Sequence, residues 1–112
     1  MYELTKSTDL SYLIGTECQS VDLNKKIIRI NLWKKIDVII NTTFLFNDEL
    51  LSTAHGYRLH VLITKKVINA SIGEKYQHLI IEFEGGNRLE LYNDFTALLS
   101  YIVIGENSVI LT

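Results

Sequence analysis

The feature that most constrains this chain is an internal repeat. The segment from Leu10 to Leu23 aligns with the segment from Leu59 to Ile72 at a constant offset of 49 residues. Each segment continues into stretches in which apolar and polar residues alternate, the pattern of strands that bury one face. A unit that occurs twice, with apolar alternation and polar turns, predicts a scaffold that presents a binding surface.

Length and composition indicate one globular domain, residues 1–112. Apolar residues make up 47% of the chain and charged residues 21%, which excludes a disordered segment. The single cysteine, Cys18, cannot form an internal disulfide and therefore suits a reducing compartment. A secretion leader and an apolar run long enough to span a membrane are both missing from the sequence. We therefore expect a cytoplasmic protein without a membrane partner.

The pattern predicts an α+β fold that consists mainly of antiparallel sheet. We expect two short helices, one ending at Gly15 and one between residues 47 and 64 with an interruption at His55-Gly56. The two pseudo-repeats cover about residues 8–46 and 57–104. About eight strands are expected, at residues 16–23, 26–32, 36–46, 66–72, 77–84, 88–93, 101–104 and 109–111.

The net charge of −2 is distributed unevenly along the chain. Residues 1–24 carry −3, residues 25–66 carry +5 and residues 67–112 carry −4, which sums to −2. The six lysines of the middle segment lie in pairs at expected strand turns, where lysines commonly protect sheet edges. This distribution favours a solvated surface over a nucleic-acid interface.

Strand register points to an acidic surface on the second repeat. If Phe83 and Leu89 both face inward and form a pair, Glu82 lies opposite Glu90 on the outer face. Like charges in this position are unfavourable by up to about 1 kcal/mol. Glu84 and Asp94 extend the same group. One interpretation is a solvated face whose carboxylates point into water, and the other is an acidic patch for a basic partner.

Two aromatic residues are further candidates for partner binding. Trp33 opens the turn Trp33-Lys34-Lys35, and alternation places it on the outer side of the sheet or at the turn. Tyr92 is expected on the outer face beside the acidic residues. A tryptophan next to charged residues often anchors an interface, although its ring can also cover a sheet edge or cap the core.

The sequence contains no recognisable catalytic set. His55 and His60 are five residues apart, which does not match the zinc spacing of i, i+4, and His78 stands alone. Cys18 occupies the position of Val67 in the other repeat, as a small core residue would. Glu82 and Glu90 lack an evident pocket for acid–base chemistry. We therefore expect neither enzymatic activity nor a bound metal or cofactor.

The layout of these elements resembles a family of small two-repeat bacterial proteins. The resemblance rests on Leu13-Ile14-Gly15, on the hairpins around Ile28-x-Ile30-x-Leu32 and Leu79-x-Ile81-x-Phe83, and on Leu99-Ser-Tyr101 before a terminal hairpin. These features are similar to immunity proteins of the contact-dependent growth inhibition type, over about residues 8–112.

Such a resemblance implies a cytoplasmic protein that binds the C-terminal domain of a secreted toxin, usually a nuclease, and blocks its active site or its access to substrate. An acidic face could occupy the cationic site of a nuclease and accelerate association. From the register we expect the partner-binding residues to be Glu82, Glu84, Glu90 and Asp94, with Trp33 or Tyr92 as aromatic anchors.

Two other functions remain open at this point. An oligomerisation or adaptor domain could pair through an exposed strand edge, either with itself or with another chain. A weak nucleic-acid-binding sheet could use the basic turn residues Lys25, Lys26, Lys34 and Lys35.

Overall fold

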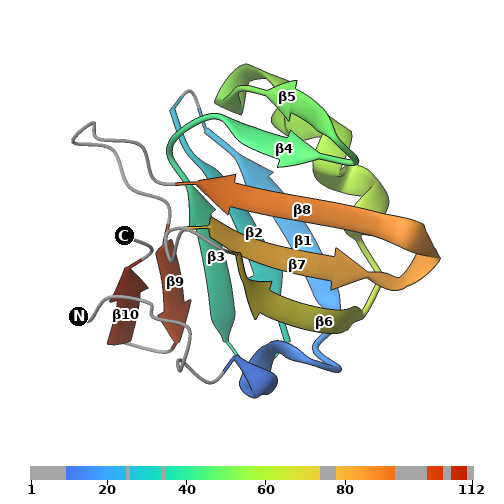
Figure 1. Cartoon of the computed structure of the whole chain (residues 1–112). Coiled ribbons are helices and arrows are strands. Elements are labelled where there is room, and N and C mark those ends of the chain that lie inside the picture. The colour runs from blue at the N-terminus through green and yellow to red at the C-terminus, as the bar shows by residue number, and fades with distance from the viewer. Residues whose placement is uncertain are drawn as a thin grey trace.

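A computed structural model describes residues 10–24, 26–33, 35–73, 78–92, 101–104 and 107–110. In these residues ten strands form two antiparallel five-stranded sheets, accompanied by short 3₁₀ helices (Figure 1). The predicted character, mostly antiparallel sheet with short helices, is therefore confirmed. Among the described residues no helix has the length and apolar character needed to cross a membrane.

The two sheets have different strand orders along the chain. The first sheet has the order β1-β2-β3-β9-β10, formed by β1 (Cys18–Leu23), β2 (Ile28–Leu32), β3 (Ile36–Ile40), β9 (Tyr101–Ile104) and β10 (Asn107–Ile110). The second sheet has the order β5-β4-β8-β7-β6, formed by β4 (Phe44–Phe46), β5 (Glu49–Leu51), β6 (Val67–Ile72), β7 (His78–Phe83) and β8 (Asn87–Tyr92). The helices are η1 (Ser11–Leu13), η2 (Thr53–Leu62) and η3 (Glu84–Gly86).

Each sheet combines three strands of one repeat with a hairpin of the other repeat. The hairpin β4–β5 follows β3 in the chain but pairs with β8 of the second sheet. The hairpin β9–β10 follows β8 in the chain but pairs with β3 of the first sheet. The two repeats therefore exchange their terminal hairpins, so neither sheet is complete with the residues of one repeat alone.

Hydrogen bonds at the start of each repeat recur at the offset that the sequence shows. The Gly15 amide donates to the Val67 carbonyl, and 49 residues later the Thr64 amide donates to the Cys18 carbonyl. Irregularities in strand pairing also recur, at Cys18/Ser20 in β1 and at Val67/Asn69 in β6. The two repeats are thus related by an approximate two-fold axis that passes between β1 and β6.

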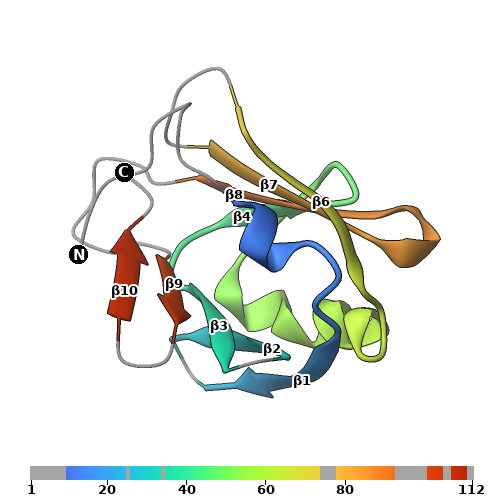
Figure 2. The same cartoon turned by 90° about the horizontal axis from the view of Figure 1, so that it is seen from below.

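One hydrophobic core lies between the two sheets, with η2 beside β1 (Figure 2). The alternating apolar residues of β2, β3, β7 and β8 point into it, as their pattern predicts. Phe44 and Phe83 are the largest of the fully buried side chains. Cys18 is also fully buried, which confirms its interpretation as a core residue.

The prediction of one continuous strand over residues 36–46 is wrong, because the structure has two strands there, β3 and β4. The chain leaves the first sheet after Ile40, crosses at Asn41–Thr43 and enters the second sheet at Phe44. Alternation does not reveal this crossing, because Ile40, Thr42 and Phe44 are all buried on either side of it. The sequence suggested one strand here because period-two burial continues through the bend.

Asn47-Asp48 forms a turn that returns the chain to the same sheet. Both residues have positive φ, 51° and 67°, as a two-residue hairpin turn requires. Phe46 is therefore paired with Glu49, and β5 follows as a short strand that the sequence analysis did not predict. The second helical segment is confirmed, including the interruption at His55, where φ is −100° and ψ is 17°.

The predicted register of the β7–β8 hairpin is wrong by two residues. Phe83 is paired with Asn87, Ile81 with Leu89 and Glu82 with Arg88, while Glu90 lies opposite Ile80. The turn is Glu84–Gly86, with φ of 83° and 80° at its two glycines. A shift of two residues leaves every side chain on its predicted face, so inward Phe83 and Leu89 are confirmed although they are not partners.

Thr64 has a backbone conformation that threonine rarely adopts. Its φ is 76°, whereas the residue at the same place in the first repeat, Gly15, has φ of 88°. A β-branched residue in the left-handed region is strained, and glycine is not. The backbone at these two equivalent positions is therefore unstrained at Gly15 and strained at Thr64.

We expect Thr64→Gly to stabilise the fold. Relief of left-handed strain contributes about 1–2 kcal/mol, and the greater freedom of glycine in the unfolded chain offsets about 0.5–1 kcal/mol of this. The unfolding free energy should rise by up to about 1 kcal/mol in denaturant titration. Gly15→Thr is the matched reverse substitution and should lower it. A destabilised Thr64→Gly protein would show that the threonine side chain contributes more than its strain removes.

Candidate partner-binding surface

The two sheets meet at a bridge between Glu17 and Lys66. These residues are equivalent in the repeat, 49 positions apart, and they form an isolated antiparallel bridge that links the starts of β1 and β6. Residues equivalent under a two-fold axis face each other where a strand pair crosses that axis. The bridge therefore joins the edge of the first sheet at β1 to the edge of the second sheet at β6.

Trp33 and Glu84 extend this bridge on its two sides. The Trp33 amide donates to the Glu17 carbonyl at 2.9 Å, and the Glu84 amide donates to the Lys66 carbonyl at 2.9 Å. The result is a row of four neighbouring residues, Trp33, Glu17, Lys66 and Glu84, which we call the junction row. At the usual strand spacing the row spans about 14 Å.

All four side chains of the junction row face outward. Their next neighbours Cys18, Leu32, Val67 and Phe83 are buried in the core. Successive side chains of a strand alternate between faces, so the junction row lies on the opposite face. Trp33 is 55% exposed, and Lys66 and Glu84 are also exposed.

Hydrogen bonds fix the backbone beneath this surface. One Glu84 carboxylate oxygen accepts the Lys66 amide at 2.8 Å, in addition to the backbone bond in the other direction. On the other side of the bridge, Gln19 Nε2 donates to a Glu17 carboxylate oxygen at 3.1 Å. A backbone that is already fixed does not have to be ordered when a partner binds, which removes one of the entropy costs of association. The arrangement can therefore hold an aromatic ring and charges of both signs ready for a protein surface.

The expected acidic patch is not formed as the sequence predicted. Glu82 is paired across the strands with Arg88, and a Glu84 carboxylate oxygen accepts the Lys66 backbone amide. Glu90 is only 5% exposed, and its carboxylate accepts the Arg88 guanidinium at 3.3 Å. Arg88 therefore lies next to two of the three carboxylates, and the predicted repulsion between Glu82 and Glu90 is wrong because the register differs.

Two other predicted binding residues lie wholly or in their side chains outside the described part of the structure. Asp94 lies outside the described residues. Tyr92 ends β8, and its side chain lies outside the described part.

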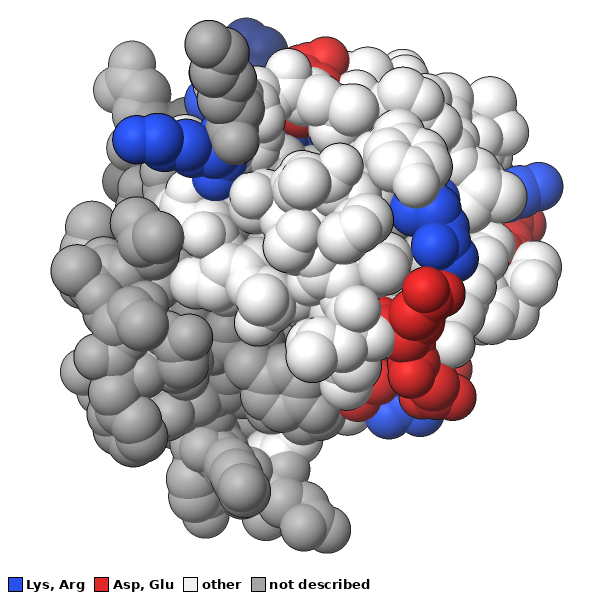
Figure 3. Space-filling model, turned by 90° about the horizontal axis from the view of Figure 1, so that it is seen from above, with Lys and Arg blue, Asp and Glu red and all other residues white. Residues whose placement is uncertain are grey.

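Seen from the end of the molecule at which β5 lies, the described acidic and basic side chains form small adjacent groups among uncharged residues (Figure 3). Trp33 is thus the predicted site residue for which the structure shows a large exposed apolar surface.

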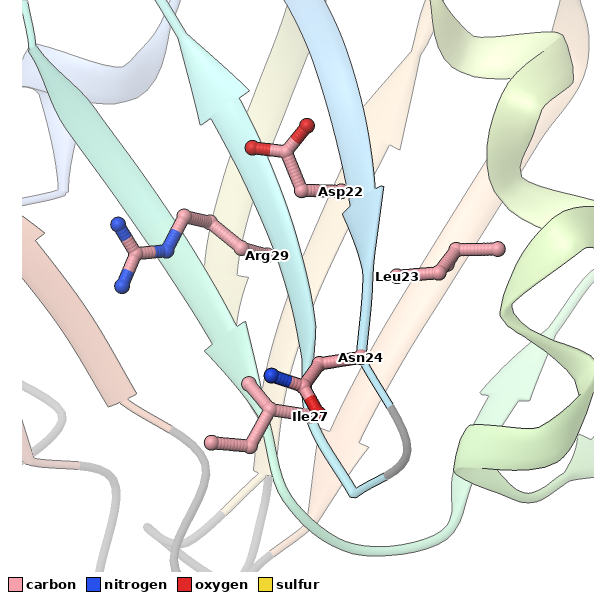
Figure 4. A pocket seen from close by; sticks show the side chains of 5 residues that line it. All are labelled: Asp22, Leu23, Asn24, Ile27 and Arg29. Atoms are coloured by element: carbon pink, nitrogen blue, oxygen red, sulfur yellow. The ribbon is translucent and has the colours of Figure 1, made fainter.

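A hollow at the end of the β1–β2 hairpin has a different character. It is lined by Asp22, Leu23, Asn24, Ile27 and Arg29. Arg29 and Leu23 point in opposite directions, so the lining groups do not converge on one point (Figure 4). Arg29 Nη1 lies 3.8 Å from Asp37 Oδ2. Asn31 Nδ2 donates a hydrogen bond to Asp22 Oδ2 at 2.8 Å. Both charged groups of the hollow already have partners within the protein.

The candidate nucleophile Cys18 and the histidine His55 have structural roles. Burial raises the pKa of the Cys18 thiol to about 11, which keeps it protonated and weakly nucleophilic at neutral pH. His55 Nδ1 accepts the Ser52 amide at 3.1 Å and so caps η2. Within the described ranges, no three His, Cys, Asp or Glu residues lie close enough together to hold a metal ion.

Comparison with protein-family models, with curated proteins and with solved structures found no match to this chain. The geometry of the chain itself must therefore carry any functional conclusion.

Sequence reasoning identified Trp33 and Glu84 but missed Glu17 and Lys66. The repeat contains a signal for them, since equivalent residues can meet only near the axis that relates the two copies. The offset of 49 pairs every position of one repeat with its equivalent, and only the fold selects Glu17 and Lys66 from these pairs.

Proposed function

We propose that this chain is an immunity protein of the contact-dependent growth inhibition type. It binds the C-terminal domain of a secreted toxin in the cytoplasm and neutralises it, with the junction row as part of the interface. The resemblance of the repeat elements implies this class, and with it a nuclease as the toxin. The cytoplasm suits the buried free thiol of Cys18.

The observation that carries the proposal is the exposure of Trp33 on a fixed part of the scaffold. Tryptophan is enriched among the residues that dominate binding energy at protein interfaces. Its position at one end of the junction row, next to Glu17 and followed by Lys66 and Glu84, combines an aromatic side chain with charged ones, and interfaces are enriched in aromatic residues and have a polar rim. The charges have both signs, so the proposed surface is not a general mimic of nucleic acid and would select one toxin domain by complementarity.

Neutralisation by this surface requires only binding. A toxin domain held on the junction row would have its active site covered, or the path of its substrate blocked by the body of the inhibitor. Neither mode needs a catalytic group on this chain.

The proposed function predicts that the gene next to that of this chain encodes a large secreted protein with a variable C-terminal domain. The test expresses that C-terminal domain in a bacterial host with and without the full chain, and growth is measured. Wild-type protein should restore growth. Failure of the wild-type protein to protect, or to bind the purified toxin domain in calorimetry, would contradict the proposed function.

We expect Trp33→Ala to weaken toxin binding by at least about tenfold, the loss of about 1.4 kcal/mol or more that is typical of an interface anchor. Tyr57→Ala is the matched control, because Tyr57 on η2 is 58% exposed and Trp33 is 55% exposed. The control should bind as wild type does. Equal effects of the two substitutions would remove the junction row from the interface while leaving the immunity function itself open to the growth assay.

A further inference from the structure

The segment that carries the chain from the first sheet to the second is three residues long. Only Asn41, Thr42 and Thr43 separate the end of β3 from the start of β4. The next strands along the chain, β4 to β8, all belong to the second sheet, and β9 belongs to the first. Asn41–Thr43 is therefore a hinge between a first part, η1 to β3, and a second part, β4 to β10.

The sequence of this hinge also suits a straight strand. Thr42 and Thr43 are β-branched, and the hinge contains neither glycine nor proline. Asn41, Thr42 and Thr43 all have negative φ. The inward positions Ile36, Val38, Ile40, Thr42, Phe44 and Phe46 continue at period two through the bend, and all are buried. Straightening the hinge would keep every one of these side chains on its present face.

We propose that this hinge can open and that two copies of the chain then exchange their first parts to form a dimer. In the dimer, β1, β2 and β3 of one copy pair with β9 and β10 of the other. Residues 36–46 of each copy become one continuous strand that connects the two globular units. The partner is thus a second copy of this chain, and the proposal does not depend on toxin binding.

Nearly all contacts of the monomer are formed again in such a dimer. The pairs between β3 and β9, such as Val38 with Ile102, re-form between copies, as does the bridge of Glu17 with Lys66. The core also re-forms from the same side chains. Monomer and dimer therefore differ mainly in the hinge and in the entropy of association, so the hinge conformation decides their balance.

The size of the monomer allows this geometry. The molecule measures 28 × 28 × 27 Å. A straight strand over residues 36–46 would extend about 36 Å at 3.3 Å per residue, which is enough to reach from one globular unit into the next. The exchange thus needs no change in any element other than the hinge.

The experiment refolds the full-length chain from denaturant at several concentrations and separates the products by size exclusion with light scattering. We expect a dimer whose ratio to monomer, measured after refolding, rises roughly tenfold for each tenfold rise in chain concentration while monomer predominates, because dimer formation is second order in the chain. Once isolated, this dimer should persist on dilution, because dissociation requires the core to open. A species that dissociates at once on dilution would be a surface association and would contradict the exchange.

Two hinge variants give opposite expectations. Deletion of Thr42 and Thr43 removes an even number of residues, so alternation is kept, but the remaining Asn41 is too short to cross between sheets and the protein should become dimeric. Insertion of Gly-Gly between Thr42 and Thr43 relaxes the crossing and should reduce the dimer fraction. If the deletion variant does not fold, the insertion variant decides alone: a dimer fraction equal to that of the wild type would overturn the proposal.

Mixing two differently tagged preparations distinguishes the exchange of first parts from a surface association of folded chains. Tagged heterodimers should form when the two chains are refolded together and not when folded dimers are mixed. Heterodimers that appear at once from folded dimers would also overturn the proposal.

Discussion

Phe83→Ala should reduce the unfolding free energy by about 3–5 kcal/mol, the usual loss for a buried phenylalanine. Phe83 is 1% exposed and lies at the end of β7 where the hairpin turns, opposite Asn87 and beside Val67 of β6. Its removal leaves a cavity beside the junction of the two sheets, where the backbone hydrogen bonds between repeats limit collapse. Such a loss is a large share of the stability of a domain of this size.

Denaturant titration followed by circular dichroism measures this loss. Phe83→Leu keeps much of the volume and should lose clearly less than Phe83→Ala. Tyr57→Ala removes an exposed ring and serves as the control with little change. A loss below about 1 kcal/mol for Phe83→Ala would show that the site collapses around the cavity or that the ring is not in the core.

Gly56→Ala should reduce the unfolding free energy by about 1–3 kcal/mol, because the new methyl group has no space. A Cβ at Gly56 would lie 2.6 Å from Cδ2 of Leu23 and 2.9 Å from Cδ1 and Cγ1 of Ile28. Leu23 is 47% exposed and can move away, whereas Ile28 is fully buried and cannot. The effect therefore depends on Ile28, and η2 must shift away from β1 and β2.

A double-mutant cycle tests this explanation. Ile28→Val removes Cδ1 and should restore part of the stability that Gly56→Ala removes, so the two changes should be less than additive. Ile36→Val at the other end of the same sheet should add independently to Gly56→Ala. Strict additivity of the Ile28 pair would mean that the new methyl group does not meet Ile28.

Local pattern was sufficient to predict most of the secondary structure of this chain. Alternation at Ile28-x-Ile30-x-Leu32 and at Leu79-x-Ile81-x-Phe83 predicts strands because one face of each is buried, and this depends only on the side chains present. The interruption of η2 at His55 was likewise predicted from the residues His55-Gly56. The predictions are wrong at places where the same alternation of apolar and polar residues is compatible with two structures.

The β7–β8 register is one such case. Inward and outward residues are the same for two registers that differ by two positions, so only turn geometry distinguishes them. The turn Glu84–Gly86 uses both glycines at positive φ and places Arg88 beside Glu82 instead of Glu84. The direct pair of Glu82 with Glu90, which depended on the other register, is therefore not formed.

The candidate site was predictable only in its separate parts. Trp33 could be assigned to an outer turn from the sequence because the strand before it alternates without interruption. That Trp33 lies in one row with Glu17, Lys66 and Glu84 depends on how the two repeats meet, and these residues are distant in the chain. Contacts across an axis of symmetry are tertiary contacts, which local periodicity does not encode.

The sequence by itself determined the repeated unit, the inward faces of the strands and the equivalence of positions 49 residues apart. These follow from period-two burial and turn residues, which act over a few neighbouring positions. Only the tertiary structure decided that the chain bends at Asn41–Thr43 and that each repeat donates its last hairpin to the sheet of the other. The physical reason is that Phe44 and Phe46 are buried equally well in a straight or a crossing strand, so the choice depends on which sheet supplies the neighbouring strand.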